Sequence, residues 1–254
     1  MSLSALVITY DEEANLEQCL ESIAWVDEIV VVDAMSSDRT CELAARFTPN
    51  VFRRPWEGYA EARRYAISKC HSDWILSIDA DERVTPELKT DIEQALKAPE
   101  HDGYLVPRKA FFLGRWMKHC GWYPGYVLRL FRKDKARVTE RKVHEGMRVD
   151  GTVGTLGHPL LHFTYPTVEA YFRRFGRYTS LAAQELHQAG RRPNLADIVL
   201  RPFFQFAKMY FAKLGLLDGI EGFVLCVFSG FYVFVKYVKL WQIPRGNPPG
   251  TPSQ

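Results

Sequence analysis

The sequence lacks the features that would assign it to several common classes of protein. Its five cysteines are odd in number and scattered, with no Cys-x-x-Cys pair. This excludes a disulfide framework and a zinc ribbon and favours a reducing cytoplasm. No basic leader or cleavable apolar stretch follows Met1, so we expect no secretion signal. Neither sign of charge dominates, because 33 Lys and Arg face 30 Asp and Glu, and a nucleic-acid-binding protein is not indicated.

Apolar residues make up 47% of the 254 positions, enough for a substantial core. β-Branched and apolar runs predict strands at residues 3–9, 28–33, 51–54 and 74–78. Turn signals followed by apolar residues at helical spacing predict helices at residues 16–23, 36–47, 58–70 and from 85 onward. This alternation predicts an α/β fold with a mostly parallel central sheet flanked by helices.

The pattern changes after Gly103. Short strand candidates separated by Gly, Pro and basic residues predict a mixed extension of the sheet at residues 104–106, 127–131, 147–149 and 160–163. Beyond Thr167 the spacing predicts helices up to residue 189, at 195–217 and at 219–241. We therefore divide the chain into an α/β domain at residues 1–165, a helical extension at 166–243 and a Pro- and Gly-rich tail at 244–254, which we expect to be disordered.

Acidic residues follow three of the predicted parallel strands. Tyr-Asp-Glu at 10–12 follows the first strand, Asp33 closes the second, and Asp-Ala-Asp-Glu at 79–82 follows the fourth. Ligands of open parallel sheets bind at these carboxyl ends, and crowded carboxylates repel one another unless a cation compensates them. Oxygen ligands suit Mg²⁺ or Mn²⁺, so we predict a divalent-metal site. The alternative is a set of solvated turn and capping residues.

Five segments in order carry a family resemblance: Val-Ile-Thr-Tyr-Asp-Glu-Glu at 7–13, Val-Val-Val-Asp-Ala-Met-Ser-Ser-Asp at 30–38, Ala-Arg-Arg-Tyr-Ala at 62–66, Asp-Ala-Asp-Glu at 79–82 and Val-His-Glu at 143–145. Together they resemble the family-2 inverting glycosyltransferases of GT-A fold, in particular the bacterial branch that adds sugars to lipopolysaccharide core and related envelope glycans. The resemblance runs to about residue 241. It implies a Rossmann-like sheet, a nucleotide-sugar donor of the UDP-sugar type, Mn²⁺ or Mg²⁺, and a lipid-linked saccharide acceptor.

The same resemblance implies roles for individual residues. Residues 1–100 become the half that binds the nucleotide-sugar, and residues 101–165 the half that binds the acceptor and carries the base. The implied donor and metal contacts are Tyr10 and Glu12 around the nucleoside, Asp33 at the uracil, Arg63 at the phosphates, Asp79 at the ribose and Asp81 on the metal. The family usually has Asn where this chain has Arg64, which leaves Arg64 as a candidate phosphate contact only. A solvated basic helix face is the alternative for both arginines.

Inversion at a sugar carbon needs a base that takes the proton of the acceptor hydroxyl. Glu145 of the Val-His-Glu segment occupies the base position of the family, and His144 beside it is a candidate acceptor contact or orienting neighbour. Glu140 and Asp134 are alternatives, although both lie in charge runs typical of solvated segments. The competing interpretation of Glu145 is a surface residue paired with a neighbouring cation.

His162 lies where an apolar strand candidate leads into the helical extension. Many GT-A enzymes have a third metal ligand or a diphosphate contact at this place, and an imidazole ligand would favour Mn²⁺ over Mg²⁺. The alternative is a hydrogen-bonded core histidine.

Basic and aromatic residues are interleaved between residues 108 and 142, a combination that suits sugars and phosphorylated glycolipids. Trp122 and, on the first late helix, Arg173 are candidate acceptor or phosphate contacts. RNA uses similar chemistry, but no Gly-Phe-type RNA signature is present, so we expect no nucleic-acid partner.

The last two predicted helices mix aromatic with basic residues, and the apolar stretch at 222–235 is shorter than the ~20 residues of a membrane span. We expect peripheral attachment to the inner face of the cytoplasmic membrane; contacts in a homo-oligomer are compatible with it.

Two other functions compete with sugar transfer. A sugar-phosphate nucleotidyltransferase would need a Gly-rich loop after the first strand, where this chain has no glycine. A non-catalytic membrane-associated scaffold would have no need of the intact carboxylates.

Overall fold

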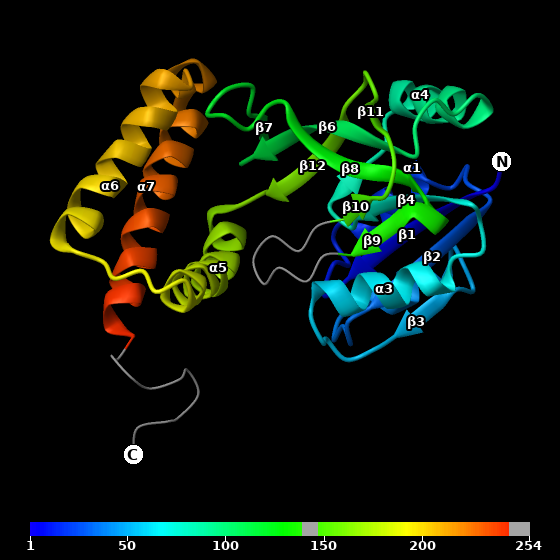
Figure 1. Ribbon diagram of the computed structural model, residues 1–254, viewed down its shortest axis with the longest axis horizontal. Coiled ribbons are helices and arrows are strands. Elements are labelled where there is room, and N and C mark those ends of the chain that lie inside the picture. Colours follow the sequence, from blue (N-terminus) through cyan, green and yellow to red (C-terminus); the bar gives the residue numbers. More distant parts are fainter. Residues whose placement is uncertain (139–146, 244–254) are drawn as a thin grey trace. The chain divides into compact units, whose positions relative to one another are not determined.

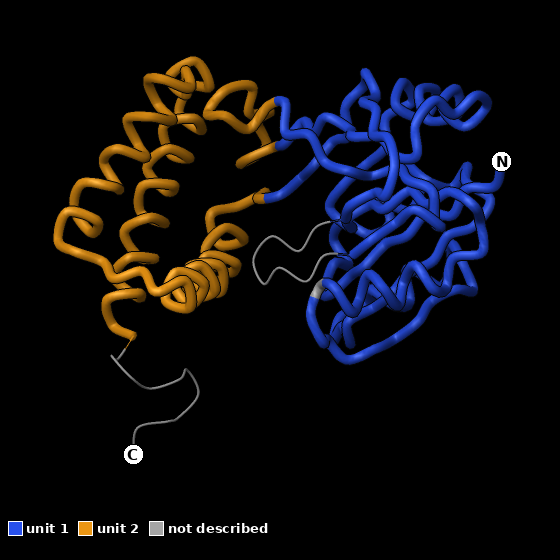
Figure 2. Tube along the Cα trace, in the orientation of Figure 1, with its two compact units in different colours: residues 1–110, 124–164 blue, residues 111–123, 165–254 orange. Residues whose placement is uncertain are grey.

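The computed structural model describes residues 1–138 and 147–243 (Figure 1). The chain forms two compact units, the first of residues 1–110 with 124–164 and the second of residues 111–123 with the C-terminal part from 165 onward (Figure 2). Residues 111–123 group with the C-terminal helices because Phe112, Met117 and Cys120 belong to the hydrophobic cluster of those helices. The predicted tail at 244–254 lies outside the described residues.

Four parallel strands form one half of the sheet in the first unit. In sheet order they are β3 (Val51–Arg53), β2 (Glu28–Asp33), β1 (Leu3–Thr9) and β4 (Trp74–Asp79). Their register places Thr9 opposite Asp33 and Ile8 opposite Asp79. The carboxyl ends of β1, β2 and β4 therefore meet at one edge of the sheet, as the alternation of strands and helices predicts.

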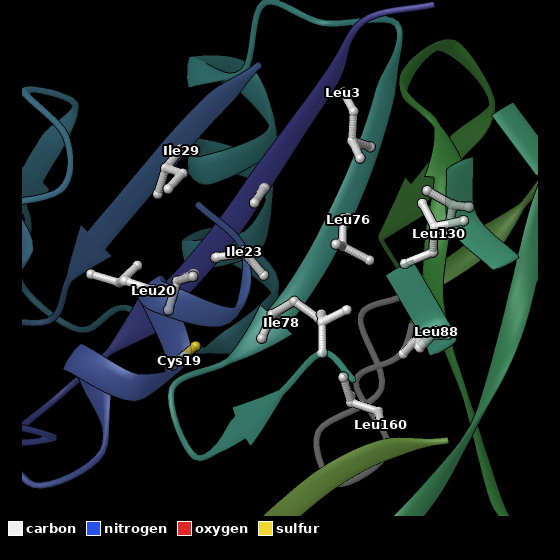
Figure 3. Packing of buried hydrophobic residues seen from close by; sticks show 14 of the residues in the cluster. Leu3, Cys19, Leu20, Ile23, Ile29, Leu76, Ile78, Leu88, Leu130 and Leu160 are labelled. Atoms are coloured by element: carbon white, nitrogen blue, oxygen red, sulfur yellow. The ribbon is translucent and has the colours of Figure 1, made fainter. Parts of the chain in front are cut away.

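Helices cover both faces of this parallel half. They are α1 (Leu16–Ser22), α2 (Thr40–Ala45), α3 (Tyr59–Lys69) and α4 (Pro86–Lys97). Alternate residues of β1 point to opposite faces. Leu3, Ala5 and Val7 join a buried cluster with side chains of α1, α2 and α4. Figure 3 shows Leu3 of this cluster with Leu20 of α1 and Leu88 of α4. Leu6 joins another cluster with Ala66 of α3. Burial of each leucine side chain contributes roughly 1.5–3 kcal/mol to the free energy of folding. Packing on both faces therefore fixes the sheet and the loops at its ends.

The sheet continues beyond β4 as antiparallel strands. β8 (Gly125–Arg132) runs antiparallel to both β4 and β6 (Gly103–Phe112), and the order then continues through β12 (Leu160–Tyr165) to β5 (Glu82–Arg83). Three smaller pairings complete the strands: β11 (Val153–Thr155) with β6, β7 (Arg115–Trp116) with β6, and β9 (Ala136–Val138) with β10 (Met147–Val149). The predicted mixed extension after Gly103 is thus confirmed, because β8 is antiparallel to both of its neighbours whereas β11 pairs with β6 in parallel.

The second unit is built from α5 (Val168–Gln188), α6 (Leu195–Ala207) and α7 (Gly219–Gln242). Thr167 caps α5 by accepting a hydrogen bond from Ala170 N at 3.1 Å, and Asn194 forms a capping box with Asp197 at the start of α6. Gly230 of α7 faces the Pro202 carbonyl of α6 so closely that a Cβ would lie 3.0 Å from it, which lets these two helices pack tightly.

The prediction of one continuous helix at residues 195–217 is wrong. The α-helix ends at Ala207 and continues as a π-helical turn (Lys208–Ala212) and then a 3₁₀ turn (Gly215–Asp218). Leu214 takes a left-handed conformation with a φ of 54°, which no α-helix interior accommodates. Among the described residues, the segment Gly215–Gln242 is the one helix long and apolar enough to cross a membrane, judged by length and composition alone.

Candidate active site

Hydrogen bonds join the loops that follow β1 and β2. Asp11 N donates to Ser36 Oγ at 2.9 Å, and Glu12 N donates to Thr40 Oγ1 at 2.9 Å. In the other direction, Ser37 N donates to Asp11 Oδ1 at 2.8 Å. These bonds also hold Asp11 at its left-handed φ of 51°. The loop that carries Tyr10 and Glu12 is therefore positioned by the loop that follows Asp33.

Asp33 is completely buried at the end of β2. Its Oδ2 accepts a hydrogen bond from Ser36 N at 2.8 Å and lies 3.5 Å from Arg53 Nε, while Oδ1 accepts from Ser36 Oγ. The carboxylate therefore fixes the β2–α2 loop, a structural role that the sequence analysis did not assign to it. Its expected contact with a nucleotide base stays a prediction.

The Asp-Ala-Asp turn brings Asp81 and His162 together. β4 turns at residues 80–81 into β5, and β5 pairs with β12 so that Glu82 lies opposite His162. Phe163 N donates to the Asp81 carbonyl at 2.8 Å, and His162 Nε2 lies 3.5 Å from Asp81 Oδ1. The exposed fractions of the Asp81 and His162 side chains are only 8% and 14%. The two residues predicted as metal ligands are thus neighbours across a strand pair.

This arrangement fits a divalent cation that completes its coordination on a substrate. A carboxylate oxygen and an imidazole nitrogen face each other, both types of ligand that Mn²⁺ accepts. Within residues 1–138 and 147–243, no group of three or more His, Cys, Asp and Glu side chains could hold a metal ion. The described residues therefore offer Asp81 and His162 as a partial ligand set and leave the other positions to phosphate oxygens or water, a common arrangement for Mg²⁺.

The positive charge of a buried arginine compensates the negative charge of the acidic turn. Arg129 of β8 donates from Nη2 to Glu82 Oε1 at 2.6 Å and to Asp79 Oδ2. Arg129 is 4% exposed and Glu82 is fully buried, while Asp79 is half-buried. Arg108 Nη1 lies 3.8 Å from the same Glu82 oxygen. Part of the carboxylate repulsion that we expected a metal to relieve is therefore relieved within the protein.

The pKa shifts of this cluster follow from its geometry. Burial acts to raise the pKa of Asp79, but the charge and hydrogen bond of Arg129, together with the charge of Arg63, hold that pKa below its ordinary value. Burial raises the pKa of Glu82, and Arg129 opposes this only in part. Although burial acts to lower the pKa of Arg129, the two carboxylates raise it above its ordinary value. Arg129 thus stays charged, and Asp79 is ionised at neutral pH.

The remaining candidate residues lie in several places. Tyr10 is 57% exposed beside the acidic edge, and the positive charge of Arg63 acts on Asp79. Arg64 forms an ion pair with Glu61 at 3.0 Å on α3. The half-buried Trp122 and the exposed Arg173 of α5 belong to the second unit. Glu145 and His144 lie outside the described residues, so their roles stay predictions.

Sequence reasoning missed the structural roles of Arg129 and Glu82. It counted Arg129 among the interleaved cations of residues 108–142, whereas the structure buries it under the turn. A usable signal was present, because Arg129 is a lone charge between apolar residues of a strand, and a charge in that position needs a buried partner. Glu82 belongs to the Asp-Ala-Asp-Glu segment, but the sequence pattern predicts no role for it.

The chain belongs to glycosyl transferase family 2, whose family model matches residues 4–149. The resemblance noted in the sequence is thereby confirmed, and the protein is a transferase. Among similar proteins is the lipopolysaccharide core biosynthesis glycosyltransferase LpsC of Rhizobium meliloti (strain 1021), 31% identical over 95% of this chain and 93% of that protein. An uncharacterized glycosyltransferase of Rickettsia bellii (strain RML369-C) is 28% identical over 99% of this chain and 90% of its own length.

Solved structures share the GT-A fold at low sequence identity. A mannosyltransferase of Pyrobaculum calidifontis, PcManGT, in complex with GDP-Man and Mn²⁺, matches 94% of this chain and 87% of its own, with a TM-score of 0.56 and 15% identity. TarS of S. aureus in complex with UDP-GlcNAc matches 92% of this chain and 82% of its own, with a TM-score of 0.50 and 15% identity. The predicted fold class is confirmed.

Proposed function

We propose that the protein is an inverting glycosyltransferase that moves a sugar from a UDP-sugar to a lipid-linked saccharide during synthesis of a bacterial envelope glycan such as lipopolysaccharide core. The observation that carries this proposal is the pairing of Asp81 with His162 at the edge where the acidic ends of β1, β2 and β4 meet. The name of the Rhizobium relative supports the acceptor class, and the UDP-GlcNAc bound to TarS supports the donor class.

Asp81 and His162 would hold a divalent cation, Mn²⁺ or Mg²⁺, together with the donor diphosphate. When bound, the cation supplies neutralising charge for the diphosphate as it leaves. Arg63 would add positive charge to the phosphates from α3, because its charge already acts on Asp79 at this edge. Asp79 would accept a hydrogen bond from the ribose. The loop that carries Tyr10 and Glu12 would line the nucleoside, since hydrogen bonds fix it beside the β2 loop.

Glu145 would act as the base in a single displacement. Its carboxylate takes the proton of the acceptor hydroxyl, the hydroxyl oxygen bonds to the anomeric carbon, and the bond from that carbon to the diphosphate oxygen breaks. The sugar configuration inverts because the oxygen attacks opposite the leaving group. This role rests on the Val-His-Glu segment of the sequence, with His144 as the neighbour that orients the base or the acceptor. Trp122, Arg173 and Arg64 would contribute further acceptor or phosphate contacts.

The site of action would be the inner face of the cytoplasmic membrane, where lipid-linked saccharides and cytoplasmic UDP-sugars meet. The second unit supports this location, because most residues in the apolar part of the segment Gly215–Gln242 are not buried. Attachment would be peripheral.

Removal of divalent metal tests this function directly. We expect a chelator to lower the rate of sugar transfer, measured by mass spectrometry on a panel of UDP-sugars and envelope acceptors, by about 10²-fold or more. Added Mn²⁺ or Mg²⁺ should restore the rate, because the diphosphate loses its counter-charge without the cation. The unfolding temperature of the chelated protein serves as the control. Full transfer activity in chelator, with no metal in the purified protein, would contradict the proposal.

A further inference from the structure

The second unit exposes a continuous set of apolar side chains on α6 and the turn that follows it. Leu200, Phe203 and Phe204 are 62%, 70% and 69% exposed, and their spacing places them on one face of α6. Phe211, in the π-helical turn that follows, is 60% exposed. Large aromatic side chains at this exposure are costly in water, and a contiguous group of them marks an interaction site.

α7 repeats the pattern along its whole length. Ile220, Phe223, Phe231 and Phe234 are 78%, 47%, 44% and 40% exposed, at helical spacing on one face. The opposite face of the helix is already used, since Leu225 and Cys226 pack into the hydrophobic cluster of the second unit. Phe231 stacks on Phe175 of that cluster and Phe223 contacts Phe206 and Tyr210. Both rings nevertheless stay exposed, at 44% and 47%.

The second unit as a whole carries a net positive charge. Residues 111–123 and 165–254 contain 13 Lys and Arg against 5 Asp and Glu, whereas the remaining residues contain 20 against 25. Three of those five acids already have partners within the unit: Asp197 pairs with Arg201, Glu221 lies 3.5 Å from Arg115, and Asp218 accepts a hydrogen bond from His119 N at 2.8 Å. Such a surface complements a negatively charged partner.

The polar neighbours of α7 argue against a transmembrane span. Near its C-terminal end, Lys239 Nζ donates to Gly176 O, Thr179 Oγ1 and Ser180 Oγ of α5 at 2.8, 2.7 and 2.8 Å. α5 in turn exposes Arg173, Arg177 and Glu185. If α7 crossed a bilayer in this packing, it would draw those charges into hydrocarbon, where each costs several kcal/mol.

We propose that the exposed faces of α6 and α7 enter one leaflet of an anionic phospholipid bilayer, with both helices lying in the membrane plane. α7, with 24 residues, provides an apolar edge of about 36 Å for this contact. Helices of this type sink roughly 5–10 Å, to the boundary of headgroups and acyl chains. The inference rests on the membrane attachment in the proposed function and specifies its surface, its lipid and its geometry.

Vesicle sedimentation of the full chain tests the surface and the lipid. We expect wild-type protein to bind vesicles containing phosphatidylglycerol more tightly than pure phosphatidylcholine vesicles, with binding that weakens as salt rises. Phe203→Ser combined with Phe204→Ser should weaken binding by at least about tenfold, because two inserted rings are lost. Val153→Ser, an exposed apolar position of the first unit at 44%, is the matched control and should bind like wild type.

Three outcomes would overturn the proposal: equal binding by the double variant, no binding by wild type, or a wild-type dimer in light scattering that the double variant abolishes without any effect on vesicle binding.

Phe231→Trp tests the geometry by fluorescence quenching with brominated lipids. In-plane helices predict quenching from shallow bromines, whereas quenching from the bilayer centre would indicate a span. Donor hydrolysis is measured on wild type and on every variant. If wild type bound vesicles but hydrolysed no donor, the proposed function would be refuted and the membrane surface would stand.

Discussion

Arg129→Met should lower the free energy of unfolding by about 3–5 kcal/mol, the usual cost of removing one partner from a buried ion pair. The substitution keeps the volume of the side chain but leaves the fully buried Glu82 and the half-buried Asp79 without their shared cation. Urea denaturation followed by circular dichroism measures the loss. The same variant should transfer sugar more slowly under folding conditions, because the turn that carries Asp81 loses its anchor.

Two further variants separate this explanation from a general effect of replacing an arginine. Arg132→Met, three residues on in the same strand and 44% exposed at its side chain, should change stability by no more than ~0.5 kcal/mol. Glu82→Gln added to Arg129→Met should recover part of the loss, since it removes a buried charge that has no partner. Arg129→Met with wild-type stability would show that the buried ion pairs do not hold the turn.

Glu145→Gln should reduce kcat for sugar transfer by about 10²–10⁴-fold, the range that a general base contributes. The amide keeps the size of the side chain but cannot take the proton of the acceptor hydroxyl. Affinity for UDP should stay at the wild-type level, because the base acts on the acceptor and not on the nucleotide. Single-turnover kinetics with saturating donor measure the effect on the transfer step.

Glu140→Gln and Asp134→Asn are the matched controls, as they remove the two alternative carboxylates. Each should transfer sugar within a few-fold of the wild-type rate. If Glu140→Gln or Asp134→Asn lost activity while Glu145→Gln kept it, the base would be reassigned. Nuclear magnetic resonance of the product adds an independent check, because a single displacement gives a linkage of opposite anomeric configuration to the donor.

The parallel half of the fold could be predicted because each strand is bounded by clear signals. Residues 28–33 are a β-branched run between two acids, and the structure has β2 with the same bounds. Prediction failed where local preference and packing disagree. The apolar spacing of residues 195–217 continues past the point where the helix ends. Gly215 there packs against the sulfur atoms of Cys226 and of Cys120, and Cys120 is 95 residues away in the sequence.

The convergence of the acidic strand ends could be predicted from the sequence, but their partners inside the protein could not. The rule that strand ends converge placed Asp33, Asp79 and Asp81 at one edge, and the register of β1 with β2 and β4 accounts for it. Which cation compensates those acids depends on the antiparallel order β4–β8, and hydrophobic periodicity carries no information on strand order. Arg129 therefore could not be assigned to Asp79 and Glu82 before the sheet was known.

In the function that we propose, the acidic edge with Asp81 and His162 holds a divalent cation and a nucleotide diphosphate together. Calorimetric titration of UDP into the full chain tests it most directly, with Mn²⁺ present or removed and with wild type against Asp81→Asn. We expect UDP to bind wild type only with Mn²⁺ present, and Asp81→Asn to bind at least about tenfold more weakly at an unchanged unfolding temperature. UDP binding that ignores both Mn²⁺ and Asp81, or no UDP binding by wild type with Mn²⁺, would contradict the claim.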